Sequence, residues 1–205
     1  MPICGRVRFW PPYEQRYDKN AERGKEMIKV SMVYKDAPAV FKTPLQQRTY
    51  ETLEKLAIPF ERVDTDEAVT MEDCLAINER LCTETVKTLF LCNRQQTVYY
   101  LFVTAGNKPF RSKDFSAALQ VSRVSFAPAE QLSLQLGVCV GATTVFGLLL
   151  PQAASVQAVL DREVLSMPWY GCSDGTTTGY MRFPTSDLID KLIPFTGHDY
   201  TIIDV

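Results

Sequence analysis

The chain has 205 residues, of which 46% are hydrophobic and 22% are charged, and its formal net charge is −2. This length and composition are those of one sizeable globular domain with room for a short appendage. No run of about 18 apolar residues occurs, so the sequence predicts no membrane-spanning segment.

Positive charge is concentrated at the N-terminus. Residues 1–43 carry nine Lys and Arg against five Asp and Glu, a net charge of +4, and the remainder of the chain carries −6. We therefore predict a basic, partly ordered N-terminal extension over residues 1–43 and a folded domain over residues 44–205. Contact with a polyanion and a merely solvated arm are both compatible with this composition, and the solvated arm is the preferred interpretation.

The six cysteines are spread along the chain without a C-x-x-C pair. No signal-peptide pattern accompanies them, and a chain of this length does not need disulfides to fold. Reduced thiols and a cytoplasmic location are therefore expected. A structural zinc site is not expected, because no closely spaced thiol pair offers an anchor and the chain has a single histidine, His198.

The first half of the predicted domain alternates helices with strands. Thr43 and Pro44 predict a helix start, because threonine is a favoured N-cap and proline a favoured first helical residue. Thr70 and Asp73 resemble a capping box and predict a second helix, which runs to about residue 81. Strands are expected over residues 60–63, 85–91 and 98–103. The last two are joined by a polar turn and predict a hairpin, and the run 98–103 is apolar on both faces, which is typical of a central strand.

The second half adds more strands than helices. Helices are expected over residues 113–119, 127–136 and 184–193, and Gly137 is the predicted C-cap of the middle one. Strands are expected over residues 145–150, 156–160, 169–172, 178–183 and 200–203. Because strands and helices mix without a strict βαβ rhythm, we predict mixed α/β packing around one sheet.

A lysine lies among apolar residues in the predicted strand 85–91. Alternate side chains of a strand share a face, so Lys87 points the same way as Leu89 and Leu91. Burial of an ammonium is costly unless a partner or a ligand anion compensates it, which would make this lysine functional. The alternative is a lysine at the mouth of the strand whose head reaches water. The local pattern does not decide between the two.

The single histidine argues against most hydrolase mechanisms. His198 lies in a predicted turn, where a surface role is favoured over a catalytic one. Nucleophilic triads, H-E-x-x-H metal sites and imidazole acid–base catalysis would all depend on it. The loop Gly141–Thr144 has neither dinucleotide-binding nor P-loop spacing, so no cofactor is expected.

Two polar loops are candidate binding elements. Gly141–Thr144 consists of small residues, which let backbone groups approach a ligand closely, and the alternative is a simple connection between a helix and a strand. Ser173–Thr178 indicates only a turn. Ser173 has no nearby partner that would make it a nucleophile, and it is expected to face solvent.

Taken in order along the chain, several motifs resemble the YbaK/prolyl-tRNA editing family. They are Val86–Arg94, Tyr99–Leu101, Val124–Ala127, Leu136–Val138, Gly141–Gly147, Asp161 and Leu188–Ile189. The similarity runs from about Pro44 to the C-terminus, and the motifs are specific as a set.

The resemblance implies a mixed, largely antiparallel sheet flanked by helices and a trans-acting aminoacyl-tRNA deacylase, most typically one that removes alanine from proline tRNA. Lys87 matches the family lysine that holds the phosphate and terminal adenosine of the acceptor end, a role suited to a point-charge donor. Gly141 matches the first residue of the family's G-x-x-x-P loop, whose backbone surrounds the ester and positions water. Lys87 and Gly141 are thus the candidate catalytic residues. The candidate substrate-binding residues are Phe126, Ala142, Thr143, Thr144, Gly147 and Ser173.

The implied partner is the aminoacylated 3′ acceptor end of a tRNA. A prolyl-tRNA synthetase or an elongation factor is a further implied partner, and the protein itself is expected to be a monomer. Positioned water and oriented backbone amides can supply much of the acceleration that an activated ester needs, so the scarcity of histidine does not oppose this activity.

The chain departs from the family pattern at the predicted site. Val145 replaces the proline that ends G-x-x-x-P, Val140 stands where proline often precedes the glycine, and Ser173–Asp174 aligns with a histidine–proline pair. Because proline fixes φ, its loss changes the constraints on the loop. The alternative function is therefore a module that binds a tRNA acceptor end or a synthetase without hydrolysis. A small-molecule enzyme on the same scaffold is a third hypothesis.

Overall fold

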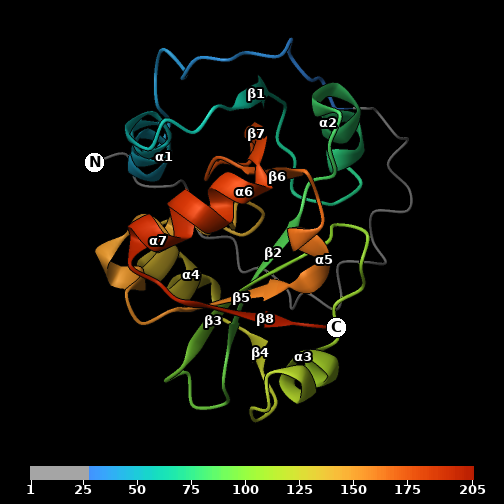
Figure 1. Ribbon diagram of the computed structural model, residues 1–205, viewed down its shortest axis with the longest axis vertical. Coiled ribbons are helices and arrows are strands. Elements are labelled where there is room, and N and C mark those ends of the chain that lie inside the picture. Colours follow the sequence, from blue (N-terminus) through green and yellow to red (C-terminus); the bar gives the residue numbers. More distant parts are fainter. Residues whose placement is uncertain (1–27) are drawn as a thin grey trace.

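The strands of the protein form two sheets (Figure 1). The computed structural model describes residues 28–205. The smaller sheet is antiparallel and has the order β1 (Glu61–Asp64), β7 (Gly179–Pro184) and β6 (Trp169–Ser173). The larger sheet is mixed and has the order β4 (Ser125–Phe126), β2 (Lys87–Cys92), β3 (Tyr99–Thr104), β5 (Gln157–Asp161) and β8 (Tyr200–Ile203).

Helices flank both sheets. They are α1 (Pro44–Lys55), α2 (Cys74–Leu81), α3 (Ser112–Ala118), α4 (Ala129–Leu136), α5 (Arg162–Leu165), α6 (Thr185–Asp187) and α7 (Ile193–Thr196). In Figure 1, α1 and α2 lie on either side of the smaller sheet, and α3 lies at the far end of the larger one. Two short 3₁₀ helices cover Val145–Leu149 and Pro151–Ala153, and a π-helical turn over Leu188–Leu192 joins α6 to α7.

The mixed α/β class is confirmed, and four of the six strand pairs are antiparallel. All six residues of β3 are buried at the centre of the larger sheet, as its two apolar faces predicted. The strands nevertheless divide into two sheets, where one was predicted. Thr85 bridges Gly171 of β6, and Val86 N donates to Gly171 O at 2.8 Å. The chain therefore pairs with the smaller sheet just before β2 and with the larger sheet from Lys87 onward.

Residues 145–149 form a 3₁₀ helix, so the prediction of a strand here is wrong. Gly147 N donates to Thr144 O and Leu150 N donates to Gly147 O, each at 3.2 Å, which satisfies these backbone groups locally. Gly147 also packs directly on α4, because a Cβ at this position would lie 2.9 Å from Leu136 Cβ. A short apolar run suits a strand or a compact helix, and packing against α4 selects the helix.

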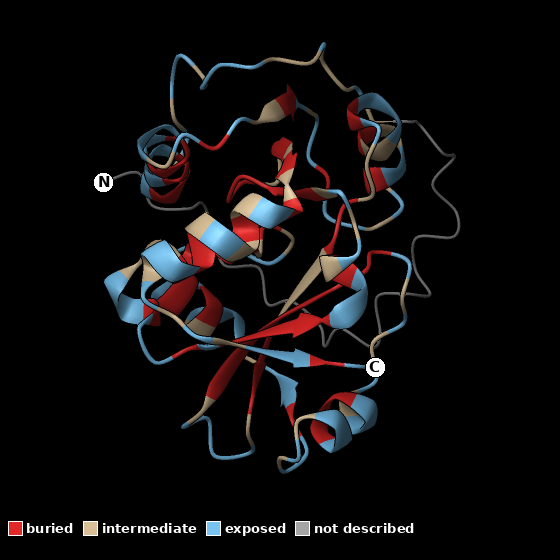
Figure 2. Ribbon diagram, in the orientation of Figure 1, coloured by how far each residue is buried: buried red, intermediate tan, exposed pale blue. Residues whose placement is uncertain are grey.

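The central strands of the larger sheet are buried on both faces. One face contributes Phe90, Leu101 and Leu160 to the main core, and the other packs Leu91 and Phe102 into a second cluster under α3. In Figure 2, β3 and β5 are buried along most of their length, and the exposed residues of the helices face outward. Within residues 28–205, no helix has both the length and the apolar character that crossing a membrane requires.

Residues 28–36 pack along β1. Tyr34 forms an antiparallel bridge with Arg62, and its ring centroid lies 4.6 Å from the guanidinium carbon of Arg62. Residues 1–27, which hold six of the nine Lys and Arg residues of the predicted extension, lie outside the described residues. The boundary at residue 43 therefore stays a prediction.

Helix α1 begins with the predicted cap. Thr43 Oγ1 accepts a hydrogen bond from Gln46 N at 3.0 Å, and Pro44 is the first helical residue. Replacement of Thr43 by alanine is expected to lower the free energy of unfolding by about 1 kcal/mol, because an N–H of the first turn loses its acceptor. Chemical denaturation measures the loss, with Thr43→Ser as the control that keeps a hydroxyl. Equal losses in the two variants would show that the hydroxyl is not the cause.

Candidate active site

Lys87 is half-buried at the first position of β2, and its head is directed at a backbone carbonyl. Nζ donates to Lys108 O at 2.6 Å. Burial lowers the pKa of Lys87 below its ordinary value. Within the described part of the chain, no carboxylate forms an ion pair with this lysine. The side chain is thus neither fully buried nor extended into water, the two alternatives that the sequence left open. Its charge is available to an anion.

A polar cluster lies beside Lys87 across the larger sheet. Thr104 is the residue opposite Lys87 on β3, and its hydroxyl donates to Asp161 Oδ2 at 2.6 Å. Lys108 Nζ donates to the same oxygen at 2.8 Å. The sequence had indicated Asp161 only by its spacing, and it gave no reason to select Lys108, because the contacts run between strands and loops that are distant along the chain.

The Gly141–Thr144 loop is tight. Gly141 has φ = 95°, in the left-handed region that favours glycine. A Cβ at this position would lie 2.8 Å from Val69 Cγ1. Thr144 Oγ1 donates to Ser173 O at 2.8 Å, so the loop is fixed to the end of β6 through the backbone of Ser173. The remaining loop residues are the buried Ala142 and the half-buried Thr143.

One segment contacts the surroundings of both candidate catalytic residues. Val69, which follows β1, lies against Gly141. Two residues further on, Met71 Cε would lie 2.7 Å from a Cβ on Gly106, in the turn that leads to Lys108. Residues 69–71 therefore lie between the Gly141 loop and the turn that holds Lys87, and Val69 is 42% exposed, so this region is at the surface.

Ser173 is buried, and the expectation that it faces solvent is wrong. Its hydroxyl donates to Thr176 O at 2.6 Å and accepts from Gly175 N at 3.0 Å. The turn between β6 and β7 folds against the start of α1, and Gly175 approaches Leu45 there. These two residues are distant in the sequence, so the residues around Ser173 do not indicate the contact. Both hydrogen bonds of the Ser173 hydroxyl therefore stabilise the turn that follows it.

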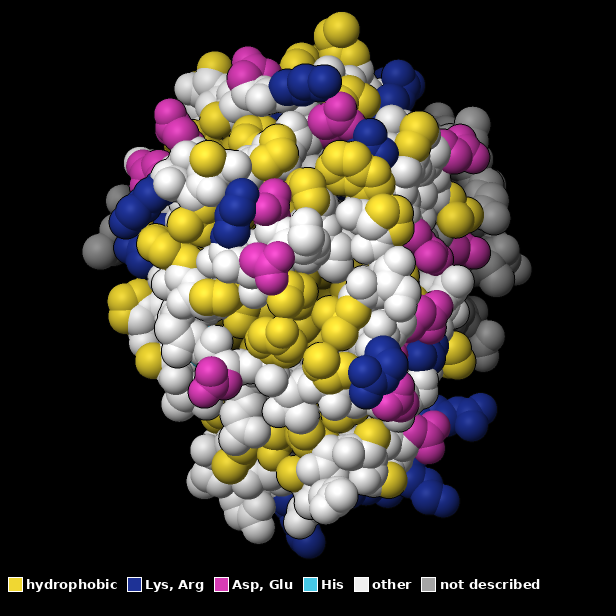
Figure 3. Space-filling model, viewed as in Figure 1, with side chains coloured by type: hydrophobic (Ala, Val, Ile, Leu, Met, Phe, Trp, Pro, Cys, Tyr) yellow, Lys and Arg dark blue, Asp and Glu magenta, His cyan; other side chains and the backbone are white. Residues whose placement is uncertain are grey.

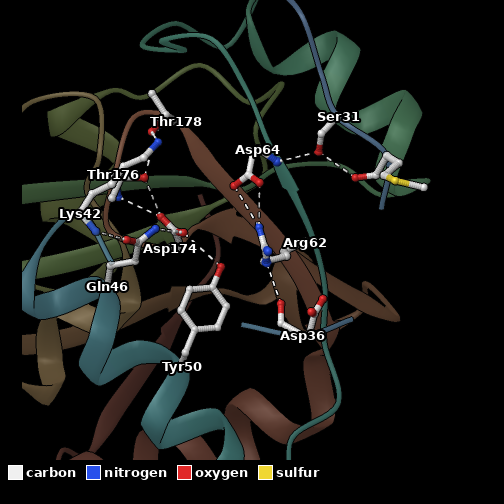
Figure 4. A network of polar contacts seen from close by, with 11 residues as sticks. Ser31, Asp36, Lys42, Gln46, Tyr50, Arg62, Asp64, Asp174, Thr176 and Thr178 are labelled. Carbon is white, nitrogen blue, oxygen red and sulfur yellow. Dashed lines mark hydrogen bonds and ion pairs between the residues drawn. The ribbon is translucent and has the colours of Figure 1, made fainter. Parts of the chain in front are cut away.

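The Asp174 carboxylate is buried and accepts four hydrogen bonds (Figure 4). Oδ2 accepts from Gln46 Nε2 at 2.7 Å and from Tyr50 OH at 3.1 Å. Oδ1 accepts from the backbone N and the hydroxyl of Thr176, at 3.1 and 2.8 Å. Burial, and then the neighbouring carboxylate, raises the pKa of Tyr50 well above its ordinary value, so the phenol stays a donor. With two donors on each oxygen, this carboxylate is occupied by the protein itself.

Three other residues lie apart from this region. Phe126 pairs with Leu91, four residues along β2 from Lys87, a separation of about 13 Å. Gly147 faces α4, as described above. His198 has both ring nitrogens 2.9 Å from protein oxygens, Ala153 O and Thr196 Oγ1, which fixes it as a structural residue. The structure thus groups Gly141, Thr144 and Ser173, and places Phe126 and Gly147 in other contacts.

Replacement of Gly141 by alanine is expected to distort the loop. The positive φ and the contact with Val69 together cost about 1–3 kcal/mol of strain, which either destabilises the fold or shifts the loop. The unfolding free energy and tRNA binding of Gly141→Ala measure the two outcomes. Gly197→Ala is the matched control, because Gly197 has φ = 76° but nothing within 4 Å of its Cβ position. Equal effects in the two variants would remove the role assigned to the Val69 contact.

This mixed α/β domain carries a half-buried lysine at the start of β2 and a tight glycine loop, which lie on either side of residues 69–71. Residues 65–191 match the sequence profile of the aminoacyl-tRNA editing domain, and the chain belongs to this family.

Three similar proteins have names that refer to prolyl-tRNA or to prolyl-tRNA synthetase. The prolyl-tRNA editing protein ProX of Acetoanaerobium sticklandii is 22% identical over 160 residues, which cover 78% of this chain and 97% of ProX. Prolyl-tRNA synthetase associated domain-containing protein 1 of Danio rerio is 26% identical over 167 residues, which cover 80% of this chain and 90% of that protein. The crystal structure of a proposed trans-editing enzyme for prolyl tRNA synthetase has a TM-score of 0.57 and 16% identity over 80% of this chain and 99% of its own. This last similarity supports the fold.

Proposed function

We propose that the protein is a trans-acting aminoacyl-tRNA deacylase, with alanine or another small amino acid esterified to proline tRNA as its substrate. The observation that carries the proposal is the ammonium of Lys87, half-buried and without a carboxylate partner among residues 28–205, in a chain of the editing-domain family. The names of the relatives support a prolyl-tRNA substrate.

In the proposed reaction, water adds to the ester carbonyl and the bond to the ribose oxygen breaks. The products are the free amino acid and a tRNA with a free terminal hydroxyl. Lys87 holds a phosphate of the acceptor end, because a compact ammonium pairs well with a phosphate oxygen. Gly141 lets the loop backbone approach the ester, where oriented amides stabilise charge on the carbonyl oxygen.

Ser173 and Asp174 have supporting roles in this proposal. The hydroxyl of Ser173 and the carboxylate of Asp174 are both hydrogen-bonded inside the protein, so neither is assigned as a nucleophile or as a partner of the substrate ammonium. They fix the end of β6, to which Thr144 is bonded. Val69 packs against Gly141 and helps to shape the loop.

The acceptor end is the part of the tRNA that the protein is proposed to recognise. On the face shown in Figure 3, Lys and Arg side chains are scattered among Asp and Glu, and no broad basic surface is present on that face. A locally held 3′ end is consistent with this charge distribution, whereas a long backbone contact on that face would need clustered cations. Prolyl-tRNA synthetase or an elongation factor remains a proposed partner, with the protein acting as a cytoplasmic monomer.

A panel of tRNAs charged with correct and incorrect amino acids tests the proposal by the rate of ester hydrolysis. Selective release of alanine or another small residue from proline tRNA is the expected result. Tight binding of the charged tRNA with no hydrolysis across the panel would instead support a binding module. Ser173 and Asp174 occupy the positions of the family's histidine–proline pair, and both side chains are hydrogen-bonded inside the protein. This observation favours the binding module.

A further inference from the structure

The position of Lys87 depends on a turn that is itself held by a buried carboxylate. Lys87 Nζ donates to the backbone oxygen of Lys108, the last residue of the turn after β3. Lys108 N donates to Ala105 O at 3.1 Å, which closes this turn. The location of the carbonyl that holds Lys87 is thus set by whatever anchors Lys108.

The anchor is Asp161, which is 1% exposed at the end of β5. Its Oδ2 accepts from Lys108 Nζ at 2.8 Å and from Thr104 Oγ1 at 2.6 Å. Its Oδ1 accepts from Glu163 N at 3.2 Å and caps α5. One carboxylate therefore fixes both the turn whose carbonyl holds Lys87 and the residue opposite Lys87 on the neighbouring strand.

Charge is divided unequally between the two lysines. Lys108 is paired with Asp161 and, at 3.2 Å, with Glu163. Burial disfavours the charge on Lys108, but these hydrogen bonds outweigh burial and raise its pKa. Asp161 and Glu163 are thereby paired with Lys108, and Lys87 donates to a backbone carbonyl instead of a carboxylate. The other charged groups here, Arg162 and Asp204, are exposed and pair with each other at 2.7 Å.

We propose that Lys108 and Asp161 are positioning residues for the Lys87 ammonium: Asp161 holds the turn, and Lys108 both presents its carbonyl to Lys87 and keeps the acids away from it. This inference rests on the proposed function for its effect on hydrolysis, but its geometric part concerns the free protein. Without the anchor, the Lys87 head is expected to become more mobile and more hydrated, and a released carboxylate is then able to compete with the substrate phosphate.

A double-mutant cycle on the full chain tests the proposal. Asp161→Asn and Lys108→Met are each expected to lower kcat/KM about ten-fold, mainly through KM, because each removes a charge-assisted hydrogen bond that orders the turn. In the Lys87→Ala background, the same changes are expected to have almost no further effect.

Lys108→Arg, which keeps the ion pairs, is expected to restore most of the activity. Arg162→Met, which removes a cation from the same corner without touching the turn, is expected to leave activity unchanged. Full additivity in the Lys87→Ala background would overturn the proposal.

A second measurement does not depend on hydrolysis. The pKa of Lys87 in the free protein is followed by NMR of ¹³C-labelled lysine, with the Lys87→Ala spectrum identifying the signal. It is expected to rise toward the ordinary lysine value in Asp161→Asn and Lys108→Met and to stay at the wild-type value in Arg162→Met. If wild type hydrolyses no charged tRNA, the proposed function fails, and this titration still decides the positioning role. An unchanged Lys87 titration in both variants would show that Lys108 and Asp161 do not position it.

Discussion

Replacement of Lys87 by alanine is expected to lower kcat/KM for ester hydrolysis by about 100-fold, with little change in the free energy of unfolding. A hydrogen bond between charged groups contributes about 1.5–3 kcal/mol, and its loss in the transition-state complex gives a rate effect of this order. The fold is expected to tolerate the change, because the side chain makes one hydrogen bond to a carbonyl and no ion pair in the described residues. The lowered pKa of Lys87 supports this expectation, because burial disfavours the charged form of this lysine in the folded state. Replacement by alanine removes that desolvation cost.

Single-turnover hydrolysis and tRNA binding, each as a function of pH, measure this effect. Because burial lowers the pKa of Lys87, the wild-type protein is expected to lose affinity for the charged tRNA at a lower pH than an ordinary lysine would allow. Lys113→Ala is the matched control, since Lys113 is an exposed lysine on α3, and it removes the same charge away from the site. Equal losses in the two variants would mean that net charge, and not the position of Lys87, governs binding. Unchanged hydrolysis in Lys87→Ala would remove this residue from the mechanism.

The sequence predicted the elements of this domain where local chemistry decides them. Thr43 and Pro44 begin α1, and Gly137 ends α4 with φ = 66°, because capping and left-handed glycine are local effects. The apolar run at 145–150 predicts a strand, but its periodicity does not distinguish a strand from a compact helix. Only the close approach of Gly147 to Leu136 does so, and that contact joins two separate segments.

The candidate site shows the same division between local and distant effects. The sequence indicates Lys87 because a lysine in an apolar strand is unusual in any context. The carbonyl that holds it belongs to Lys108, 21 residues away, and the anchor Asp161 is 53 residues from Lys108. Lys108 lies in a turn and Asp161 at the end of a strand, where polar residues are common, so nothing in their sequence neighbourhoods distinguishes them. The resemblance to the editing family indicates Asp161, but its contacts depend on the packing of β3, β5 and the turn after β3.

Replacement of Asp174 by alanine is expected to lower the free energy of unfolding by about 3 kcal/mol or more. The change leaves three side-chain donors, on Gln46, Tyr50 and Thr176, without their acceptor in a buried region, and each unsatisfied group costs about 1–3 kcal/mol. Tyr50→Phe removes a single donor and leaves the carboxylate with three, so its cost is expected to be nearer 1 kcal/mol. Chemical denaturation of the two variants measures the difference. Asp204→Ala, which removes an exposed carboxylate paired with Arg162, is the control and is expected to leave the midpoint unchanged.

The same variant separates a supporting role of Asp174 from a direct role in binding. The network joins α1 to the turn after β6 (Figure 4). Thr144 of the candidate loop donates to the backbone oxygen of Ser173, the last residue of β6. If Asp174 acts only through this network, Asp174→Ala and Tyr50→Phe should reduce hydrolysis in proportion to their loss of stability. Asp174→Asn, which keeps the shape and one acceptor, should lie between them in both measurements. A variant that stays as stable as wild type but loses selectivity among amino acids would show that the Asp174 carboxylate contacts the substrate directly. The purely structural role assigned to its four hydrogen bonds would then be wrong.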